Sequence, residues 1–410
     1  MIKTKGSLSQ ILTQSALRHK GFRRLWVATL LSSTGRWADI VVVGWLTLEL
    51  TDSALMVGIV TACKMAGYVL APLMGVAADR IDRRKLLILA SMVSGLISVV
   101  MLFLLTTGLL TIGYLIALSL LSSLTWALDN PTRQALVPDL VDPEDLTNAI
   151  AMNSVAIEIT VIVGPALGGL LIPLLGLSGA YWLIATIYFL ELFVLFQLNS
   201  TKHSSPRSHE PPFKSLMSGF SYAWQHHAVL IPLLIALALN LLVAPYRYSF
   251  LPLYARYVLD VGPAGYGFLT SMAGCGALVT GLWIIAQKKL ERRGRLLMLG
   301  SLVWPASLFL FSLSTSYYLS LVLVFIAGLA QAVCWTMIAT LILSNTSPAM
   351  RGRVMGLRTG VVISLPLGNL LAGAAAQSWG PVFALGAYTA SAALLMGLIF
   401  ILASKLRHLD

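Results

Sequence analysis

Twelve long apolar runs, separated by short polar segments, constrain the fold of this chain more than any other feature. A helix needs about 20 apolar residues to cross a hydrocarbon core of about 30 Å, since each residue advances it by ~1.5 Å. Helices also satisfy their own backbone hydrogen bonds, which lipid cannot do. The runs are uniformly apolar, whereas the strands of a membrane β-barrel would alternate. They predict membrane-spanning helices over Leu25 to Leu50, Leu55 to Ala78, Leu86 to Thr106, Ile112 to Val137, Ala149 to Leu175, Ala180 to Leu198, Val229 to Val258, Gly265 to Ala286, Leu296 to Leu313, Tyr317 to Leu343, Val354 to Ala376 and Val382 to Ala403.

Charge is scarce and unevenly placed along the chain. Hydrophobic residues make up 58% of the 410 residues and charged residues only 11%, whereas about a quarter of a soluble domain is charged. This composition predicts a polytopic, all-α membrane protein and excludes a soluble enzyme. The net charge of +12 does not indicate nucleic-acid binding, because Lys and Arg gather in alternate loops and leave the others with little beyond Arg256. The positive-inside rule therefore predicts that both termini are cytoplasmic.

One hydrophilic stretch inside the chain, Asn199 to Gln225, has the Ser, Pro and charged composition of a flexible linker and divides the spans into six plus six. Residues 1–24 are polar and basic without the pattern of a secretory leader, so we expect the N-terminus to be kept. The cysteines lie within apolar runs, which favours packing over a disulfide or a metal site. The predicted organisation is an N-terminal segment 1–24, a six-helix bundle 25–198, a cytoplasmic linker 199–225, a second six-helix bundle 226–404 and a tail 405–410.

A dense charged cluster between the second and third spans carries a family resemblance. It resembles the signature loop of the major facilitator superfamily, Gly-x-x-x-Asp-Arg-x-Gly-Arg-Arg/Lys, although Asp82 stands where that pattern has Gly. The Asp-x-Pro-x-Arg-Gln stretch that begins at Asp129 is similar to the bacterial branch containing siderophore exporters of the enterobactin type and macrolide efflux proteins. In the fifth span, a Gly-Pro-x-x-Gly stretch is similar to a pattern of proton-driven exporters. The matching residues are Gly75, Asp79, Arg80, Arg83 and Arg84 in the loop, and Gly164, Pro165, Gly168 and Gly169 in the fifth span.

The resemblance implies twelve helices in two pseudo-symmetric six-helix bundles around a central cavity, an arrangement known for this superfamily. It implies a monomeric secondary transporter in the bacterial inner membrane, surrounded by lipids, that exports an amphipathic small molecule of the drug or siderophore class by alternating access and proton antiport. No phosphate-binding Gly-x-x-x-x-Gly-Lys-Ser/Thr motif occurs in the sequence, so the energy would come from a gradient. We expect no enzymatic activity and no cofactor.

Ionisable residues within the spans are candidates for coupling or substrate binding, because lipid disfavours them. Arg36 and Asp39 share one face of the first span at i, i+3 spacing, and Lys64 lies at a comparable depth in the second. They are expected either to contact substrate and protons or to form a static neutral pair.

Glu158 lies near the middle of the fifth span, where burial would disfavour its charged form and let it exchange a proton. It is either the proton-coupling carboxyl or a protonated structural residue. Trp37 and Trp126 neighbour the charged positions and are candidate cavity residues. Arg247 is a weaker substrate-binding candidate, which alternatively extends to the outer headgroups. Glu191, near the inner third of the sixth span, is also a weaker candidate, with a structural partner as the equal alternative.

Asp129 and Arg133, four residues apart in the inner half of the fourth span, are predicted to belong to an inner gate near Asp79. The glycines and proline of the fifth span permit close packing or a kink, either for switching or for ordinary helix contact. The basic residues of the signature loop anchor to headgroups or serve only as topology signals.

Two other functions stay open from the sequence. The same fold supports lipid or lysolipid movement between leaflets. Activity without a pH gradient would favour this function. A non-transporting membrane receptor would bind its ligand without flux. Transport is favoured because a receptor has little reason to bury Arg36, Asp39, Lys64 and Glu158.

Overall fold

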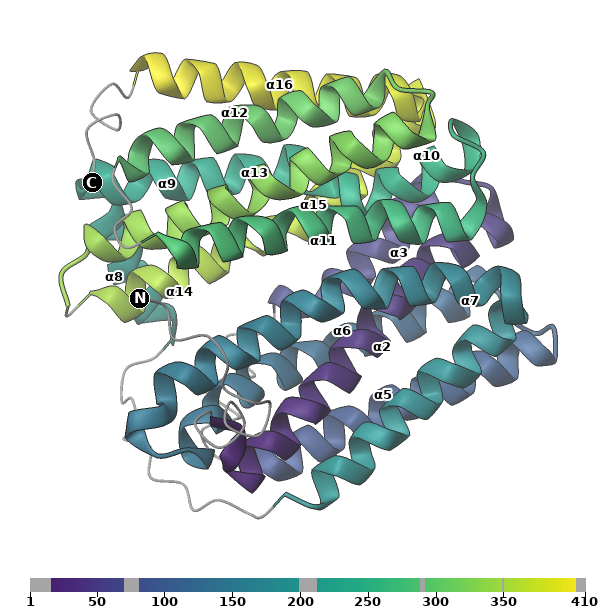
Figure 1. The fold of residues 1–410 in the computed structure, drawn as a ribbon. Coiled ribbons are helices and arrows are strands. Elements are labelled where there is room, and N and C mark those ends of the chain that lie inside the picture. The colour runs from purple at the N-terminus through teal and green to yellow at the C-terminus, as the bar shows by residue number, and fades with distance from the viewer. Residues whose placement is uncertain (1–15, 70–80, 199–211, 288–291, 349, 403–410) are drawn as a thin grey trace, which may run out of the picture.

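The computed structural model describes residues 16–69, 81–198, 212–287, 292–348 and 350–402. All regular elements of the described residues are helices, gathered in two halves that lie side by side (Figure 1). The N-terminal half contains η1 (Ala16–Arg18), α2 (Lys20–Thr51), α3 (Ala54–Met65), α5 (Arg83–Thr106), α6 (Ile112–Leu136), η2 (Val137–Leu140), η3 (Pro143–Asp145) and α7 (Leu146–Phe196).

The C-terminal half begins inside the predicted linker, where α8 is helical rather than flexible. Its seventh span consists of α9, two π-helical segments and α10, and its eleventh consists of α14 and α15. The domain boundaries stay predictions. The elements are α8 (Pro212–Gln225), α9 (His227–Ala238), η4 (Leu239–Val243), η5 (Tyr246–Phe250), α10 (Leu251–Tyr257), α11 (Gly262–Ala286), α12 (Arg293–Ser312), α13 (Tyr317–Ser344), α14 (Arg351–Val361), α15 (Ser364–Trp379) and α16 (Pro381–Leu402).

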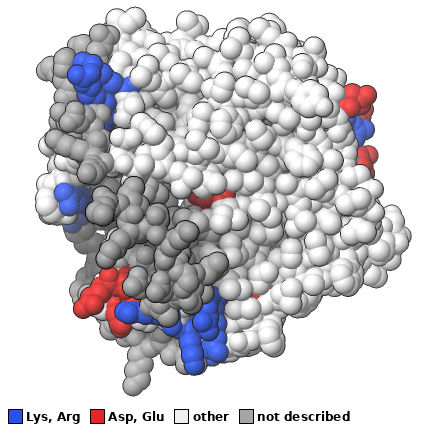
Figure 2. Space-filling view, in the orientation of Figure 1, with Lys and Arg blue, Asp and Glu red and all other residues white. Residues whose placement is uncertain are grey.

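Helix length and composition fit a multi-pass membrane protein. Within the described ranges, nine helices are long and apolar enough to cross a membrane, and the shorter apolar helix Ala54–Val69 holds the described part of the second span. One of the nine, Pro143–Phe196, holds two predicted spans, because the chain reverses at Gly176, whose φ of 71° favours glycine. Figure 2 shows Lys and Arg gathered mainly at one end and a broad band of uncharged surface beside them.

The departure from the signature pattern at Asp82 has a local structural role. Asp82 is the N-cap of α5, where its Oδ1 accepts hydrogen bonds from the backbone N–H of Arg84 at 2.9 Å and of Lys85 at 3.4 Å. A carboxylate in this position satisfies backbone donors that the first helical turn leaves without partners. The residue that weakens the family motif therefore starts the third span.

The two halves cross most closely at pairs of glycines. A Cβ built on Gly58 of α3 would lie 2.8 Å from the Cα of Gly373 on α15. One built on Gly169 of α7 would lie 2.7 Å from the Cα of Gly267 on α11. Both distances are shorter than ordinary van der Waals contact, so only glycine permits these backbone approaches without a shift.

Polar contacts between the halves lie near the first of these crossings. Ser53 Oγ donates to Gln377 Oε1 at 2.9 Å, and the Tyr257 hydroxyl donates to Asp52 Oδ1 at 2.6 Å. These residues follow α2 or end α10 and α15, at the end of the molecule that the charge pattern predicts to face outward. We call it the predicted outer end and the opposite end, where α2 begins, the predicted inner end. The orientation itself stays a prediction.

Candidate functional site

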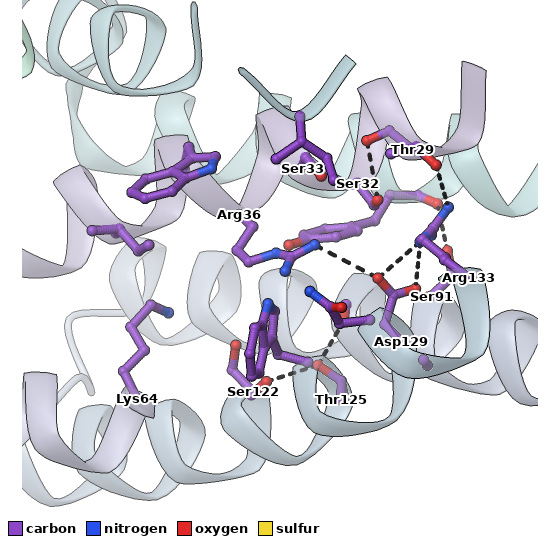
Figure 3. Close-up of a pocket in the computed structure, with 18 of the residues that line it drawn as sticks. Thr29, Ser32, Ser33, Arg36, Lys64, Ser91, Ser122, Thr125, Asp129 and Arg133 are labelled. Carbon is purple, nitrogen blue, oxygen red and sulfur yellow. Dashed lines mark hydrogen bonds and ion pairs between the residues drawn. The ribbon is translucent and has the colours of Figure 1, made fainter. Parts of the chain in front are cut away.

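A cavity of about 220 Å³ lies within the N-terminal half, among α2, α3, α5, α6 and α7 (Figure 3). Of the described residues that line it, Tyr248 alone comes from the C-terminal half. The wall combines hydroxyl groups with charged side chains. Its serines and threonines are Thr29, Ser32, Ser33, Thr61, Ser91, Ser94, Ser122 and Thr125.

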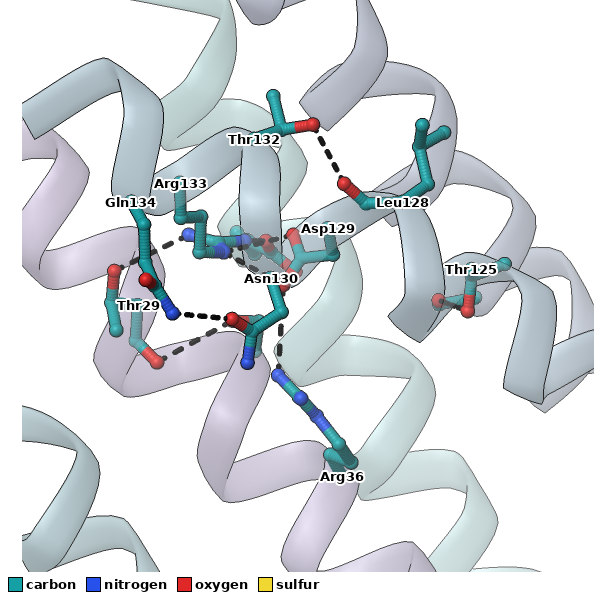
Figure 4. Close-up of polar contacts among 12 residues, drawn as sticks. Thr29, Arg36, Thr125, Leu128, Asp129, Asn130, Thr132, Arg133 and Gln134 are labelled. Atoms are coloured by element: carbon teal, nitrogen blue, oxygen red, sulfur yellow. Dashed lines mark hydrogen bonds and ion pairs between the residues drawn. The ribbon is translucent and has the colours of Figure 1, made fainter. Parts of the chain in front are cut away.

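Four alternating charges form a chain of ion pairs along this wall. Figure 4 labels three of the four residues, Arg36, Asp129 and Arg133. Arg133 donates from Nε to both carboxylate oxygens of Asp129 at 2.8 Å, and its Nη2 pairs with Glu191 Oε1. The Nη2 of Arg36 lies 3.6 Å from Asp129 Oδ2. We call Arg36, Asp129, Arg133 and Glu191 the charge chain. It joins the first, fourth and sixth predicted spans.

The chain is deeply buried toward its Glu191 end. Glu191 is 1% exposed, Arg133 4% and Asp129 8%. Single charges at such depth would be strongly unfavourable, and removing one partner of a buried pair leaves the other uncompensated. Alternation of sign, with two cations and two carboxylates, makes burial of the whole set tolerable.

A second, half-buried ion pair has its cation, Lys64, in the wall of the cavity. Lys64 Nζ pairs with Asp39 Oδ2, and the Tyr181 hydroxyl donates to Asp39 Oδ1 at 3.0 Å. The sequence grouped Arg36 with Asp39 and Lys64. The structure brings Lys64 and Asp39 into contact, whereas Arg36 pairs with a carboxylate of the fourth span.

Both candidate tryptophans lie under guanidinium groups. The Arg36 guanidinium carbon lies 5.9 Å from the Trp126 ring centroid, and Tyr68 packs against the same indole with centroids 4.0 Å apart. This arrangement gives one wall of the cavity a flat apolar surface with a cation at its edge.

Trp37 contributes the corresponding contact with the C-terminal half. Its ring stacks with Tyr248 at a centroid distance of 6.4 Å, and the Arg247 guanidinium carbon lies 5.3 Å from its centroid. Arg247 is buried, and its Nε and Nη2 have no hydrogen-bond partner among the described residues. It does not extend to the surface, so the alternative of headgroup contact does not hold in this conformation. Glu158, half-buried on α7, interacts electrostatically with Arg247.

The glycine motif of α7 serves two different contacts. A Cβ on Gly164 would clash with Trp37, and one on Gly168 would lie 2.6 Å from the Ala38 carbonyl oxygen, so both positions pack against α2. Gly169 faces α11 of the other half, and the Pro165 carbonyl oxygen approaches Gly267 there. The motif therefore fixes one face of α7 within its bundle and lets another face meet the opposite bundle.

The signature loop is described only in part. Gly75, Asp79 and Arg80 lie outside the described residues, so the predicted contact between Asp79 and Arg133 stays a prediction. Arg83 Nη1 donates to Asp139 Oδ2 at 2.6 Å, and Arg84 Nη2 donates to the Phe196 carbonyl oxygen at 2.7 Å. These contacts join the start of α5 to η2 and α7, beyond any role in headgroup binding or topology.

Glu191 is the cavity residue that the sequence ranked too low. It was placed near the inner third of the sixth span, without a named partner. The sequence held one clue to its partners: Glu191, Asp129 and Arg133 all lie toward the inner ends of their spans. The direction in which Glu191 faces could not be read from its sequence.

Two helical halves, one of which holds a polar, ion-paired cavity, define a secondary transporter of the major facilitator fold. The chain belongs to a family of this superfamily described as transmembrane secretion effectors, whose model matches residues 11–410. The family is one of transporters rather than enzymes.

Curated relatives match most of the chain. The enterobactin exporter EntS of Escherichia coli (strain K12) is 28% identical over 98% of this chain and 96% of its own length. The staphyloferrin A transporter of Staphylococcus aureus (strain NCTC 8325 / PS 47) is 24% identical over 85% of this chain and 87% of its own.

Solved structures support the fold alone. A peptide transporter POT in complex with sulfate has a TM-score of 0.78 and 14% identity, covering 99% of both chains. A bacterial homologue of the human lysosomal transporter Spinster, inward-facing and unoccupied, has a TM-score of 0.71 and 15% identity, covering 96% of both chains. The likeness extends over nearly the whole length in each case.

Proposed function

We propose that this protein exports an amphipathic small molecule, of the drug or siderophore class, across the bacterial inner membrane by alternating access in exchange for protons. The observation that carries the proposal is the polar cavity with its charge chain, buried inside one bundle of a transporter fold. Ionisable groups inside a membrane protein are costly even when paired, and by default they indicate a substrate or proton pathway. Two relatives named for siderophore transport support this substrate class.

The two bundles can act as a device with two states, one open to each side of the membrane. Close glycine crossings and polar contacts join them at the predicted outer end. The cavity then receives substrate from the predicted inner side, and rocking of the bundles exposes it to the other. Asp79 remains the proposed inner latch, with Asp129 and Arg133 beside it.

Proton coupling was assigned from the sequence to Glu158 or Asp39. Asp39 has partners on both oxygens, Lys64 and Tyr181. Glu158 has neither a hydrogen bond nor an ion pair among the described residues. Both stay candidates that exchange experiments can separate.

Flux in proteoliposomes tests the function. Purified protein is reconstituted, a pH gradient is imposed, and movement of ethidium, erythromycin and enterobactin is followed in separate preparations. We expect gradient-dependent movement of at least one probe, absent from protein-free liposomes. The variants Glu158→Gln and Asp39→Asn are compared with the parent, and unchanged gradient dependence in both removes these two residues as coupling sites.

The rival functions give different results in the same vesicles. A lipid transporter would move a fluorescent lysolipid between leaflets without a pH gradient. A receptor would bind a probe and show no flux. The hydroxyl-rich and charged wall suits a polar substrate group better than acyl chains, which is why small-molecule export is preferred.

A further inference from the structure

Glu191 combines three properties among the carboxyls of the cavity. It is 1% exposed, it lines the cavity, and its Oε2 has no hydrogen-bond partner among the described residues. Its other oxygen, Oε1, accepts from Arg133. An ionised carboxylate offers about four acceptor sites over its two oxygens. At Glu191 one whole oxygen is left without a donor in a site shielded from bulk water.

The other carboxyls near the cavity are more fully occupied. Both oxygens of Asp129 accept from Arg133, and both oxygens of Asp39 have partners. Glu158 is half-buried and is not among the described residues that line the cavity. Among these carboxyls, Glu191 is therefore the one whose buried Oε2 has no donor among the described residues and can accept a proton that enters through the cavity.

The groups around Glu191 connect it to the substrate side of the wall. From α6, Arg133 and Asp129 face it; from α5, the Ser91 hydroxyl faces it; and Tyr188 precedes it by one turn on α7. Arg36 of α2 completes the surroundings through its pair with Asp129. The charged groups that act on Glu191, namely Arg133 and Asp129, are thus both members of the charge chain.

We propose that Glu191 is the residue that carries the exchanged proton and that the charge chain transmits its protonation to Arg36 at the cavity. This inference rests on the proposed exchange of substrate for protons. A hydronium ion that reaches the cavity transfers its proton to Oε2: one O–H bond of hydronium breaks, an O–H bond forms at Oε2, and a water molecule is left. The charge chain thereby changes from neutral to one net positive charge. Arg133 then has Asp129 as its one ionised partner. Its stronger attraction for Asp129 weakens the ion pair between Asp129 and Arg36.

This shift changes what Arg36 offers to a substrate. With Glu191 ionised, Arg36 shares Asp129 with Arg133. With Glu191 protonated, Arg36 becomes an uncompensated cation over Trp126, so the cavity repels cations and attracts anions. Proton binding at Glu191 and substrate binding at Arg36 therefore influence each other through the ion pairs of the charge chain, although the proton and the substrate bind to different atoms.

Infrared difference spectroscopy tests the protonation without any substrate. The full chain in detergent is titrated from about pH 5 to about pH 9, a range that spans the ionisation of a buried carboxyl but not of an exposed one. We expect the carbonyl band of a buried protonated carboxyl to disappear as pH rises. The band should be absent from Glu191→Gln and retained in Glu158→Gln, the matched substitution in the preceding span. Its persistence in Glu191→Gln, its loss from Glu158→Gln, or the absence of a titrating band would overturn the proposal.

A flux measurement separates coupling from a structural role. Gln keeps an oxygen that accepts from Arg133, so Glu191→Gln is expected to fold, which size-exclusion chromatography checks. The variant mimics protonated Glu191 and should bind the cation ethidium more weakly. With ethidium as probe, it should lose accumulation driven by a pH gradient and keep counterflow between vesicles and medium at ethidium concentrations high enough to offset the weaker binding. Retained gradient-driven accumulation would contradict Glu191 as proton carrier. If the parent moves no probe at all, the export proposal fails, while the infrared result still decides the role of Glu191.

Discussion

A single methyl group at the outer crossing should change which side of the protein is open. In Gly58→Ala, the added Cβ would lie 2.8 Å from both the Asn369 carbonyl oxygen and the Cα of Gly373. Both obstacles are backbone atoms of α15, which cannot rotate away as a side chain does. The strain falls on the conformation in which α3 and α15 touch and is absent where they separate.

The size of the shift follows from the cost of overpacking. One extra carbon in a tight contact costs about 1 to 3 kcal/mol, which corresponds to a change of about 5-fold to 150-fold in the ratio of open to closed molecules. Gly397→Ala is the matched control, because a Cβ at that position on α16 meets no heavy atom within 4 Å. The control should leave the ratio unchanged.

Cysteine labelling measures this ratio. Ile40 lines the cavity, so Ile40→Cys, in a background without the three native cysteines, reports access from outside to a membrane-impermeant maleimide. We expect the labelling rate to rise at least about fivefold in the Gly58→Ala background, the lower bound of the strain estimate. Equal rates in the Gly58→Ala and Gly397→Ala backgrounds would refute the assignment of this crossing as the closed outer contact.

Two further predictions concern stability. Arg133→Gln leaves Asp129 and Glu191 buried without their cation and should destabilise the protein by about 3 to 5 kcal/mol, whereas Glu191→Gln keeps a hydrogen-bond acceptor and should melt close to the parent; equal melting of both variants would contradict the charge chain. His19, hydrogen-bonded to Asp145 at 2.7 Å, lowers the pKa of that carboxyl, which precedes the fifth predicted span. A lowered pKa means that the contact stabilises the fold above about pH 4 and that this stabilisation is lost as the pH falls further. Asp145→Asn should therefore reduce the dependence of the melting temperature on pH at acid pH. An unchanged dependence would show that the contact contributes nothing.

The sequence predicted the spans well because hydropathy and length are local properties. It also placed Asp39 and Lys64 at comparable heights, since helical rise converts residue number into height, and the two side chains do form an ion pair. It could not identify the partner of Arg36, because that partner depends on how the first and fourth spans cross. Asp129 lies far along the chain from Arg36, and the two meet only in the folded bundle.

The same limit explains why Glu191 was ranked below Glu158. Both are single carboxyls in apolar helices, and their surroundings differ only through the reversal of α7 at Gly176. After that reversal the sixth span packs beside α5, and Glu191 pairs with Arg133 of α6. Arg133 thereby gains a second carboxylate partner besides Asp129. The linker shows a related limit, since its composition suggested flexibility while Pro212–Gln225 is helical.

Charge balance at the cavity links the kind of substrate to the direction of coupling. Three cations face three carboxylates there, and the six residues are Arg36, Lys64 and Arg133 with Asp39, Asp129 and Glu191. In this neutral set, one proton on Glu191 leaves a net charge of +1 within reach of the substrate. A cationic substrate and the proton then disfavour each other, which is the requirement for exchange, whereas an anionic substrate and the proton favour each other. Antiport by this route therefore belongs to substrates that present a positive group to Arg36, and the charge of the transported molecule decides whether the proton moves against it or with it.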